Sequence, residues 1–179
     1  MKKLLLLTLC TAMSLARAGE PRTVRAVLVP MADRNPAQVF VLRNAAGKAV
    51  RTSHYRGRVV LLDFWATECG GCKVEIPGFI GLQQEYKNKG LTAVGISMDI
   101  LYEGLKSAEE GWGRVNPFVK QEGVNYPILM GDDAVSKAYN IQAMPATYLL
   151  DRKGRIAATY IGIVNQTDIE TNLKILIAE

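Results

Sequence analysis

The sequence predicts an α/β fold in which a central mixed β-sheet has helices on both faces and an N-terminal β-hairpin extends it. Strand-like and helix-like patterns alternate along most of the chain, which favours a sheet covered by helices. Residues 59–64 form an apolar run interrupted by one acid, as in a strand that is buried on both faces. The 179 residues are 49% hydrophobic and 22% charged, which suits one ordinary globular domain.

Residues 1–18 have the pattern of a secretory signal peptide. A basic start precedes an apolar stretch that is too short to span a bilayer, and a small-x-small cleavage site follows it. We expect cleavage after Ala18 and a periplasmic or otherwise extracytoplasmic protein; a retained membrane anchor is the alternative. Cleavage would remove Cys10 and leave Cys69 and Cys72, so that no third thiol could mispair in an oxidising compartment.

The charge of the chain gives no reason to expect a nucleic-acid partner. The formal net charge is +5, and three of the basic residues, Lys2, Lys3 and Arg17, lie in the expected signal peptide. The sequence shows no clustered basic face of the kind that binds nucleic acid.

Two short segments precede the buried strand. Residues 19–35 show no clear period and contain two prolines, so we interpret them as an N-terminal extension that pairs along the sheet edge or stays loose. Residues 39–42 and 48–51 predict a hairpin in which Gly47 supplies the positive φ of a tight connection. The globular domain is therefore expected to comprise residues 36–179.

Two cysteines three residues apart follow the buried strand. If Cys69 takes the first position of the next helix, Cys72 lies one turn further on the same face, within disulfide distance. Unpaired N–H groups and the positive end of the helix dipole would stabilise a thiolate on Cys69. Cys69 is therefore expected to be the nucleophile, and Cys72, deeper in the helix, the resolving thiol.

A zinc site and a purely structural disulfide are the alternatives for this pair. Zinc prefers four cysteine or histidine ligands, but the chain has no second CxxC, and its single histidine, His54, precedes the strand. A structural bridge between Cys69 and Cys72 would close a ring of only a few residues, which restrains the unfolded chain little. Redox chemistry is therefore favoured, and neither a metal nor a cofactor is expected.

The chain after the cysteines continues the α/β alternation. Residues 73–88 have a helical pattern, and residues 92–97 predict the next strand. No element is predicted for residues 99–114, which form a variable region. Asn116 and Pro117 then predict a helix start, with asparagine as the cap and proline in the first turn.

Four further elements complete the predicted order. They are a strand, a helix, a β-hairpin and a final helix, at residues 126–130, 132–139, 148–161 and 167–177. Asp132 and Asp133 are placed to cap the first of these helices, and Gly154 to close the hairpin. A capping box from Thr167 to Glu170 marks the expected start of the final helix.

The motif FWATECGGC, at residues 64–72, resembles the thioredoxin superfamily. The flanking residues, YRGRVVLLDFWAT and KVEIP, resemble the extracytoplasmic TlpA/ResA-like branch of thiol-disulfide oxidoreductases, whose redoxin domain is of the AhpC/TSA type. The resemblance covers roughly residues 35–179 and implies the thioredoxin fold. Three residues depart from the branch: Glu68 stands where tryptophan is usual, Gly71 where proline is frequent, and Asp63 where asparagine is frequent.

The resemblance also implies roles for residues near the cysteines. Asp63 matches the buried acid of thioredoxin, which is implicated in proton transfer to and from the second cysteine, and Glu75 matches the active-site glutamate of the ResA-like branch. An acid that simply faces solvent is the alternative for both. Met144 and Pro145 match the family's cis-proline element, which faces the disulfide and pairs with the substrate backbone. Trp65, within the motif, is a further supporting residue.

The expected activity is the reduction of disulfides in partner proteins, as in cytochrome c maturation, by Cys69 and Cys72. By resemblance, such a protein is recharged by a membrane thiol-electron donor of the DsbD/CcdA type. The expected direction rests mainly on the resemblance, because Glu68 disfavours a thiolate on Cys69 whereas Lys73 favours it.

Three other functions use related sites. A DsbA-like disulfide oxidase would use the same cysteines, but the large helical insertion of that class is not evident. A peroxiredoxin-like thiol peroxidase has its reactive cysteine in a T-x-x-C setting, and the segment 67–69 is one residue short of it. A copper-binding module of the Sco-like kind, which would not be an enzyme, needs CxxxC and a downstream histidine, and neither is present.

Overall fold

The computed structural model describes residues 21–179, so the expected signal peptide, residues 1–18, lies outside the described residues. The strands are β1 (Val41–Arg43), β2 (Ala49–Arg51), β3 (Val59–Trp65), β4 (Leu91–Ser97), β5 (Ile128–Met130), β6 (Ala146–Leu150) and β7 (Ile156–Ile161). The helices are α1 (Gly70–Tyr86), α2 (Asp99–Tyr102), α3 (Ala108–Glu122), α4 (Asp133–Ala138) and α5 (Gln166–Ala178), with 3₁₀ turns at Met31–Asp33, Thr52–Tyr55 and Lys87–Lys89.

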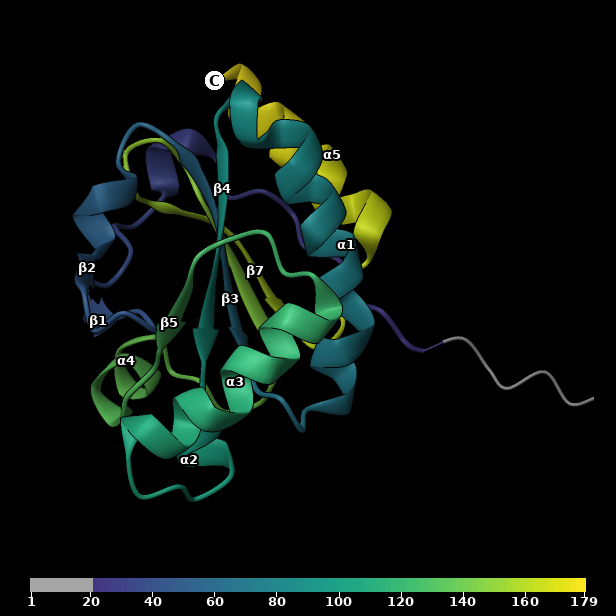
Figure 1. The fold of residues 1–179 in the computed structure, drawn as a ribbon. Helices are drawn as coiled ribbons and strands as arrows, with labels where there is room; N and C mark the ends of the chain where they lie inside the picture. Colours follow the sequence, from purple (N-terminus) through teal and green to yellow (C-terminus); the bar gives the residue numbers. More distant parts are fainter. Residues whose placement is uncertain (1–20) are drawn as a thin grey trace, which may run out of the picture.

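Within residues 21–179 the strands form one seven-stranded mixed sheet in the order β2-β1-β5-β4-β3-β6-β7 (Figure 1). β3 lies at the centre, parallel to β4 on one side and antiparallel to β6 on the other. The hairpin of β1 and β2 joins one edge through an antiparallel contact with β5, and β7 forms the other edge. A mixed sheet with helices on both faces and an N-terminal hairpin confirms the predicted fold class.

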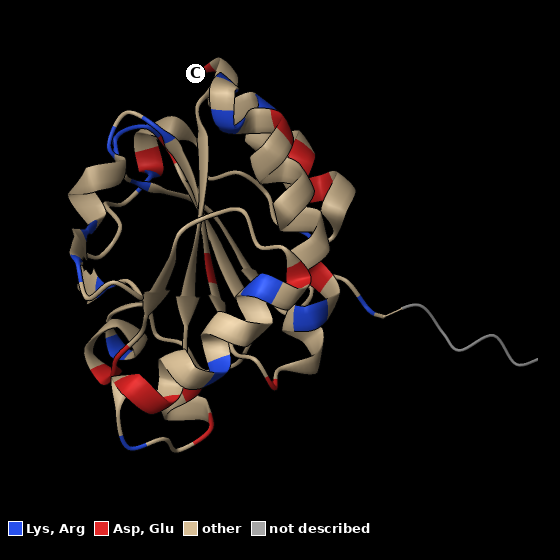
Figure 2. Ribbon diagram, in the orientation of Figure 1, with Lys and Arg blue, Asp and Glu red and all other residues tan. Residues whose placement is uncertain are grey.

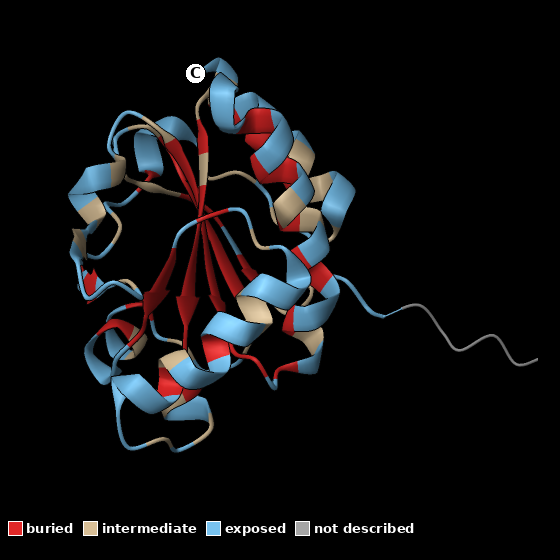
Figure 3. Ribbon diagram, viewed as in Figure 1, coloured by how far each residue is buried: buried red, intermediate tan, exposed pale blue. Residues whose placement is uncertain are grey.

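The central strand separates two apolar layers. Charged residues lie mainly on the helices and loops around the sheet (Figure 2), whereas β3 is buried along its whole length (Figure 3). Leu61 and Trp65 pack in the layer of α1, α3 and α5, and Val60 and Leu62 pack in the layer of α4. Because side chains alternate along a strand, Asp63 points into the same layer as Leu61 and Trp65, under α1.

Helix α3 begins earlier than expected, so the predicted start at Asn116 and Pro117 is wrong. The N-cap is Ser107, whose hydroxyl accepts a hydrogen bond from the N–H of Glu110 at 3.2 Å. This cap, with acidic residues in the first turn, suits the positive end of a helix. These signals outweigh Pro117, which lies inside the helix and removes one of its backbone hydrogen bonds.

Helix α5 also begins before its predicted start. Its N-cap is Asn165, whose side-chain oxygen accepts a hydrogen bond from the N–H of Asp168 at 3.0 Å. The capping box predicted for Thr167 and Glu170 is therefore wrong. Glu170 instead accepts a hydrogen bond from the Tyr86 hydroxyl at 2.8 Å, which links α5 to α1.

The described part of the N-terminal extension runs beside β7 and the β6–β7 turn. Val24 forms a parallel bridge to Val164, and Pro36, directly after the extension, forms an antiparallel bridge to Arg155. No helix in residues 21–179 has both the length and the apolar character needed to cross a membrane.

Candidate active site

The two cysteines lie where β3 leads into α1. Cys69 is the N-cap of α1, one position earlier than expected, and its Sγ accepts a hydrogen bond from the N–H of Cys72 at 3.2 Å. The two residues form a disulfide, with their Cα atoms 5.3 Å apart. Cys69 is 4% exposed and Cys72 is 0% exposed. A partner can therefore reach only the sulfur of Cys69.

The turn that precedes Cys69 is fixed to the end of β4 by Asp99. The Thr67 N–H donates a hydrogen bond to Asp99 Oδ1 at 3.1 Å, and the Thr67 hydroxyl donates to the same oxygen. The Ser97 hydroxyl donates to Asp99 Oδ2 at 2.8 Å. Because Asp99 is fully buried, these bonds are shielded from water and hold the turn in one position.

Sequence reasoning did not identify Asp99 as a site residue. It lies at the start of the variable region and belongs to no motif. Its position could have marked it as a candidate. Asp99 follows the carboxyl end of β4, which lies beside the carboxyl end of β3, and functional polar groups of α/β sheets gather at this edge.

The cis-proline segment packs directly against the disulfide loop. The peptide bond between Met144 and Pro145 is cis. A Cβ atom at position 71 would lie 3.0 Å from Pro145 Cδ and 3.2 Å from Ile163 Cγ1, closer than most such contacts. Gly71 therefore allows the two segments to approach each other. A Cβ atom at Gly70 would have no neighbour within 4 Å.

We expect Gly71→Ala to be less stable than Gly70→Ala by about 1–3 kcal/mol. Alanine in place of glycine stabilises a helix by roughly 0.5–1 kcal/mol, which Gly70→Ala should gain. The methyl group at position 71 must displace Pro145 or Ile163, and overpacking of this kind costs about 1–3 kcal/mol. Denaturant unfolding of the two oxidised variants measures the difference, and equal stabilisation of both would contradict the close packing.

Asp63 is a buried carboxyl group in the layer that contains Cys72. It is fully buried, and neither of its side-chain oxygens has a hydrogen-bond partner among the described residues. Burial raises the pKa of Asp63 well above its usual value, and the carboxyl group of Glu75 raises it further. The burial excludes the alternative in which Asp63 faces solvent.

Glu75, one turn after Cys72 on α1, is a second buried carboxyl group. It is 4% exposed, and its Oε2 accepts a hydrogen bond from the N–H of Val164 at 3.0 Å. Burial raises the pKa of Glu75 to about 8, because it outweighs the opposite effect of the bond from Val164. Glu75 is therefore not an ordinary surface charge, and around pH 7 it is largely protonated.

Two residues that sequence reasoning did not single out lie near these carboxyl groups. Thr147 is the cross-strand partner of Asp63 on β6, and its buried hydroxyl has no partner in residues 21–179. Burial raises the pKa of Tyr126, as do the nearby charges of Asp63 and Glu75. Neither residue carries a motif, because their proximity to Asp63 depends on the order of the strands.

Trp65 packs α3 against the end of β3. Its ring centroid lies 5.2 Å from that of Phe118, and its indole N–H has no partner among the described residues. A Cβ atom at Gly95 on β4 would lie 2.7 Å from the indole nitrogen, so glycine leaves room for the ring. Trp65 is 1% exposed, so its position is set by packing on both sides.

The charges beside Cys69 pair with each other. Lys73 Nζ lies 3.5 Å from Glu68 Oε2, and both side chains are about half exposed. An exposed ion pair of this kind contributes about 0–1 kcal/mol. The opposed effects that the sequence suggests for Glu68 and Lys73 therefore largely cancel.

No metal site is found in the part of the chain that the structure describes, which holds no group of three or more histidine, cysteine, aspartate or glutamate side chains suited to an ion. His54 is exposed, and its Nδ1 accepts a hydrogen bond from the N–H of Arg51 at 3.3 Å.

The fold and the site together define a class of protein. A central strand that ends in a cysteine pair at the start of a helix, with a cis-proline segment packed against it, defines a redox protein of the thioredoxin fold. Residues 34–159 match the AhpC/TSA family, and the chain belongs to this family.

Relatives of known type agree with this membership. The chain is 32% identical to the thioredoxin-like protein YneN of Bacillus subtilis over 134 residues, which cover 75% of this chain and 74% of YneN. It is 32% identical to the thiol-disulfide oxidoreductase ResA of Geobacillus kaustophilus over 136 residues, which cover 75% of this chain and 72% of that protein.

A solved structure extends the similarity to three dimensions. The thiol:disulfide interchange protein DsbE of Chlorobium tepidum superposes with a TM-score of 0.71 at 25% identity, covering 80% of this chain and 96% of that chain. The predicted relationship to ResA-like proteins is confirmed, and the protein is a thiol-disulfide oxidoreductase.

Proposed function

We propose that the protein reduces disulfides of partner proteins outside the cytoplasm, with Cys69 as the nucleophile and Cys72 as the resolving thiol. The observation that carries this proposal is the difference in access between the two sulfurs, since Cys69 is slightly exposed and Cys72 is fully buried. The pattern of residues 1–18 supports a location outside the cytoplasm. The domain would then comprise residues 36–179, after the signal peptide and the extension 19–35.

The reaction conserves disulfides and moves two electrons. The Cys69 thiolate attacks one sulfur of a partner disulfide, which forms a mixed disulfide and releases the other partner sulfur as a thiolate that takes up a proton. Cys72 then loses its proton and attacks Cys69. This step breaks the mixed disulfide, releases the second partner thiolate and forms the Cys69–Cys72 disulfide.

The buried carboxyl groups are proposed to serve the second step. Cys72 has no access to solvent, so its proton must pass to a buried group, and two are available: Asp63, which points under α1, and Glu75, one turn after Cys72 on α1. The cis-proline segment, Met144 and Pro145, is proposed to pair with the partner backbone, and Trp65 to hold the end of β3 in place.

The same carboxyl groups favour the reducing direction. When ionised, they disfavour a thiolate on Cys72, and a dithiol whose thiolate is less stabilised gives up its electrons more readily. The oxidised protein would be recharged by a membrane thiol-electron donor of the DsbD/CcdA type, which the resemblance of the motif at residues 64–72 and its flanks implies. The substrate class is proteins that carry a disulfide.

The direction can be tested by equilibrating the protein with glutathione buffers. We expect a reduction potential well below the approximately −120 mV of DsbA, so that conditions which reduce a DsbA-like couple leave this pair oxidised. Thiol alkylation followed by mass spectrometry measures the oxidised fraction. A potential near that of DsbA would instead make the protein a disulfide oxidase.

The partners can be captured with Cys72→Ala. This variant retains Cys69 but cannot resolve the mixed disulfide, so it should accumulate covalent complexes that a reductant releases. The matched control, in which Cys69 and Cys72 are both alanine, should trap nothing. Capture by Cys72→Ala only of small thiols, and of no protein, would contradict a protein substrate.

A further inference from the structure

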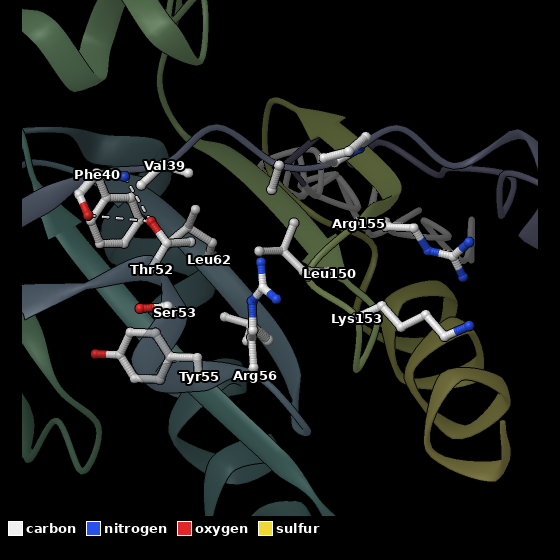
Figure 4. Close-up of a pocket in the computed structure, with 14 residues that line it drawn as sticks. Val39, Phe40, Thr52, Ser53, Tyr55, Arg56, Leu62, Leu150, Lys153 and Arg155 are labelled. Carbon is white, nitrogen blue, oxygen red and sulfur yellow. Dashed lines mark hydrogen bonds between the residues drawn. The ribbon is translucent and has the colours of Figure 1, made fainter.

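A cavity of 330 Å³ lies on the opposite face of the sheet from the cysteines (Figure 4). Its floor is apolar and is formed by Val60, Leu62 and Leu150, which belong to the layer of α4 rather than to the layer of Cys72. Val60 and Leu150 are direct cross-strand partners on β3 and β6. The cavity is therefore separate from the redox site.

The shortness of α4 explains why no helix covers this part of the sheet. Tyr139, at the end of α4, packs against Phe64 and Tyr148, with ring centroids 5.0 and 5.1 Å away. These contacts cover the end of β3 nearest the cysteines. The six residues of α4 do not line the cavity, whereas Val60 and Leu62 in the first half of β3 do.

The walls of the cavity carry positive charge and no negative charge. They come from the segment after the extension, from the connector before β3, and from the β6–β7 turn, within residues 36–40, 52–56 and 153–155. Arg56, Lys153 and Arg155 are among the lining residues, and no acidic residue is. Figure 4 shows the Arg56 side chain between Tyr55 and Lys153, with Leu150 beside it.

Two of these positive charges lack a partner in the described chain. Arg155 is neutralised by Asp151, whose Oδ2 lies 2.7 Å from Arg155 Nη2. Neither Arg56 nor Lys153 forms an ion pair within residues 21–179. An apolar cavity with a few placed charges at its edge is the arrangement that binds and orients a small molecule.

We propose that this cavity binds a small amphiphile with a carboxylate head, such as a medium-chain fatty acid. Arg56 and Lys153 hold the carboxylate, and the arginine can do so with two parallel hydrogen bonds. The apolar chain covers Val60, Leu62 and Leu150. The volume of 330 Å³ is near the lower limit of small-molecule sites, about 300–1,000 Å³, so a fatty acid of moderate length suits it better than a nucleotide or a peptide.

Calorimetric titration of the oxidised full chain with three compounds tests this proposal. Decanoate should bind, whereas decanol, which lacks the charge, and butyrate, which lacks the chain, should each bind at least about 10-fold more weakly. Methyl NMR of the valines and leucines should show shifts at Val60, Leu62 and Leu150. Shifts centred instead on Leu101, which lines a second cavity together with Met144 of the cis-proline segment, would overturn the location.

Variants separate the contributions of charge and shape. The double variant Arg56→Gln/Lys153→Gln should weaken decanoate binding about 10-fold and leave decanol unchanged. Ala37→Phe, which fills part of the cavity without altering its charge, should abolish both. Arg25→Gln, an exposed arginine that does not line the cavity, is the matched control and should have no effect.

Three results would overturn the proposal. Equal binding of decanol and decanoate would show that the charges do not select a carboxylate. An equal loss for Arg25→Gln and the double variant would show attraction by net charge alone. No measurable binding of decanoate would show that the basic residues, Arg56 and Lys153, only cover the apolar floor with their own side-chain stems.

Discussion

Asp63→Asn should slow the release of the mixed disulfide about 100-fold and change the first attack by Cys69 less than about twofold. Only the second step needs a Cys72 thiolate, and Cys72 has no contact with solvent. Asp63 is fully buried in the same layer and has no hydrogen-bond partner among the described residues, so its oxygens are free to accept the proton. Asparagine has a similar shape but cannot accept it.

Stopped-flow measurement of both steps across pH tests this assignment. In the unaltered protein the second step should become faster as pH rises and Asp63 loses its proton, and in Asp63→Asn this dependence should disappear. Glu75→Gln is the comparison variant. It keeps an acceptor for the N–H of Val164 and should mainly shift the cysteine titrations. Equal slowing of both steps by Asp63→Asn, or no slowing, would refute the assignment.

The free energy of unfolding of the oxidised protein should fall on the order of 4 kcal/mol between about pH 4.5 and pH 9. The pKa of Glu75 is raised from 4.5 to about 8, and that of Asp63 is also raised, so the folded state holds protons that the unfolded state has released. Stability is therefore greatest below the unfolded pKa and is lost as pH rises through the folded pKa. One pKa unit corresponds to about 1.4 kcal/mol.

Urea unfolding of the oxidised protein at a series of pH values measures this slope. Glu75→Gln should flatten much of it, and adding Asp63→Asn should remove most of the remainder. Glu122→Gln, which removes an exposed carboxylate on α3, is the matched control and should leave the slope unchanged. Stability that stays constant or increases over this pH range would show that both carboxyl groups ionise in the folded state at no cost.

The local parts of this structure could be predicted from the sequence. The apolar run before Cys69 and the spacing to Cys72 predict β3 and the first turn of α1, and Gly47 predicts the hairpin turn, where its φ is 73°. Each of these features depends on residues that are close together in the chain, so the pattern is sufficient.

The first residues of α3 and α5 are harder to predict from the sequence, because each segment contains two possible N-cap residues. The caps are Ser107 and Asn165 rather than Asn116 and Thr167. In α3 the earlier start adds more than two turns, which bury Gly111 and Val115. The capping preference of a single residue does not indicate how much of the helix will be buried.

The carboxyl pair depends on contacts between elements. The sequence marks both Asp63 and Glu75 as candidates, but their burial and mutual influence follow from how α1 lies on β3. The same holds for Thr147, which faces Asp63 only because β6 pairs antiparallel with β3. The order of the strands in the sheet cannot be predicted from a local sequence pattern.

The pairing of Val24, in the extension, with residues 163–165 makes the redox site sensitive to proteolysis of the N-terminal segment. Its N–H donates to the Ile163 carbonyl at 2.7 Å, and its carbonyl accepts from the Asn165 N–H at 2.9 Å, while Val164 between them donates to Glu75. An exopeptidase that digested the chain from its N-terminus through Val24 would remove both backbone hydrogen bonds that hold residues 163–165. The Val164 N–H that orients Glu75 would then move, and the cysteine titrations would shift although both cysteines remained intact.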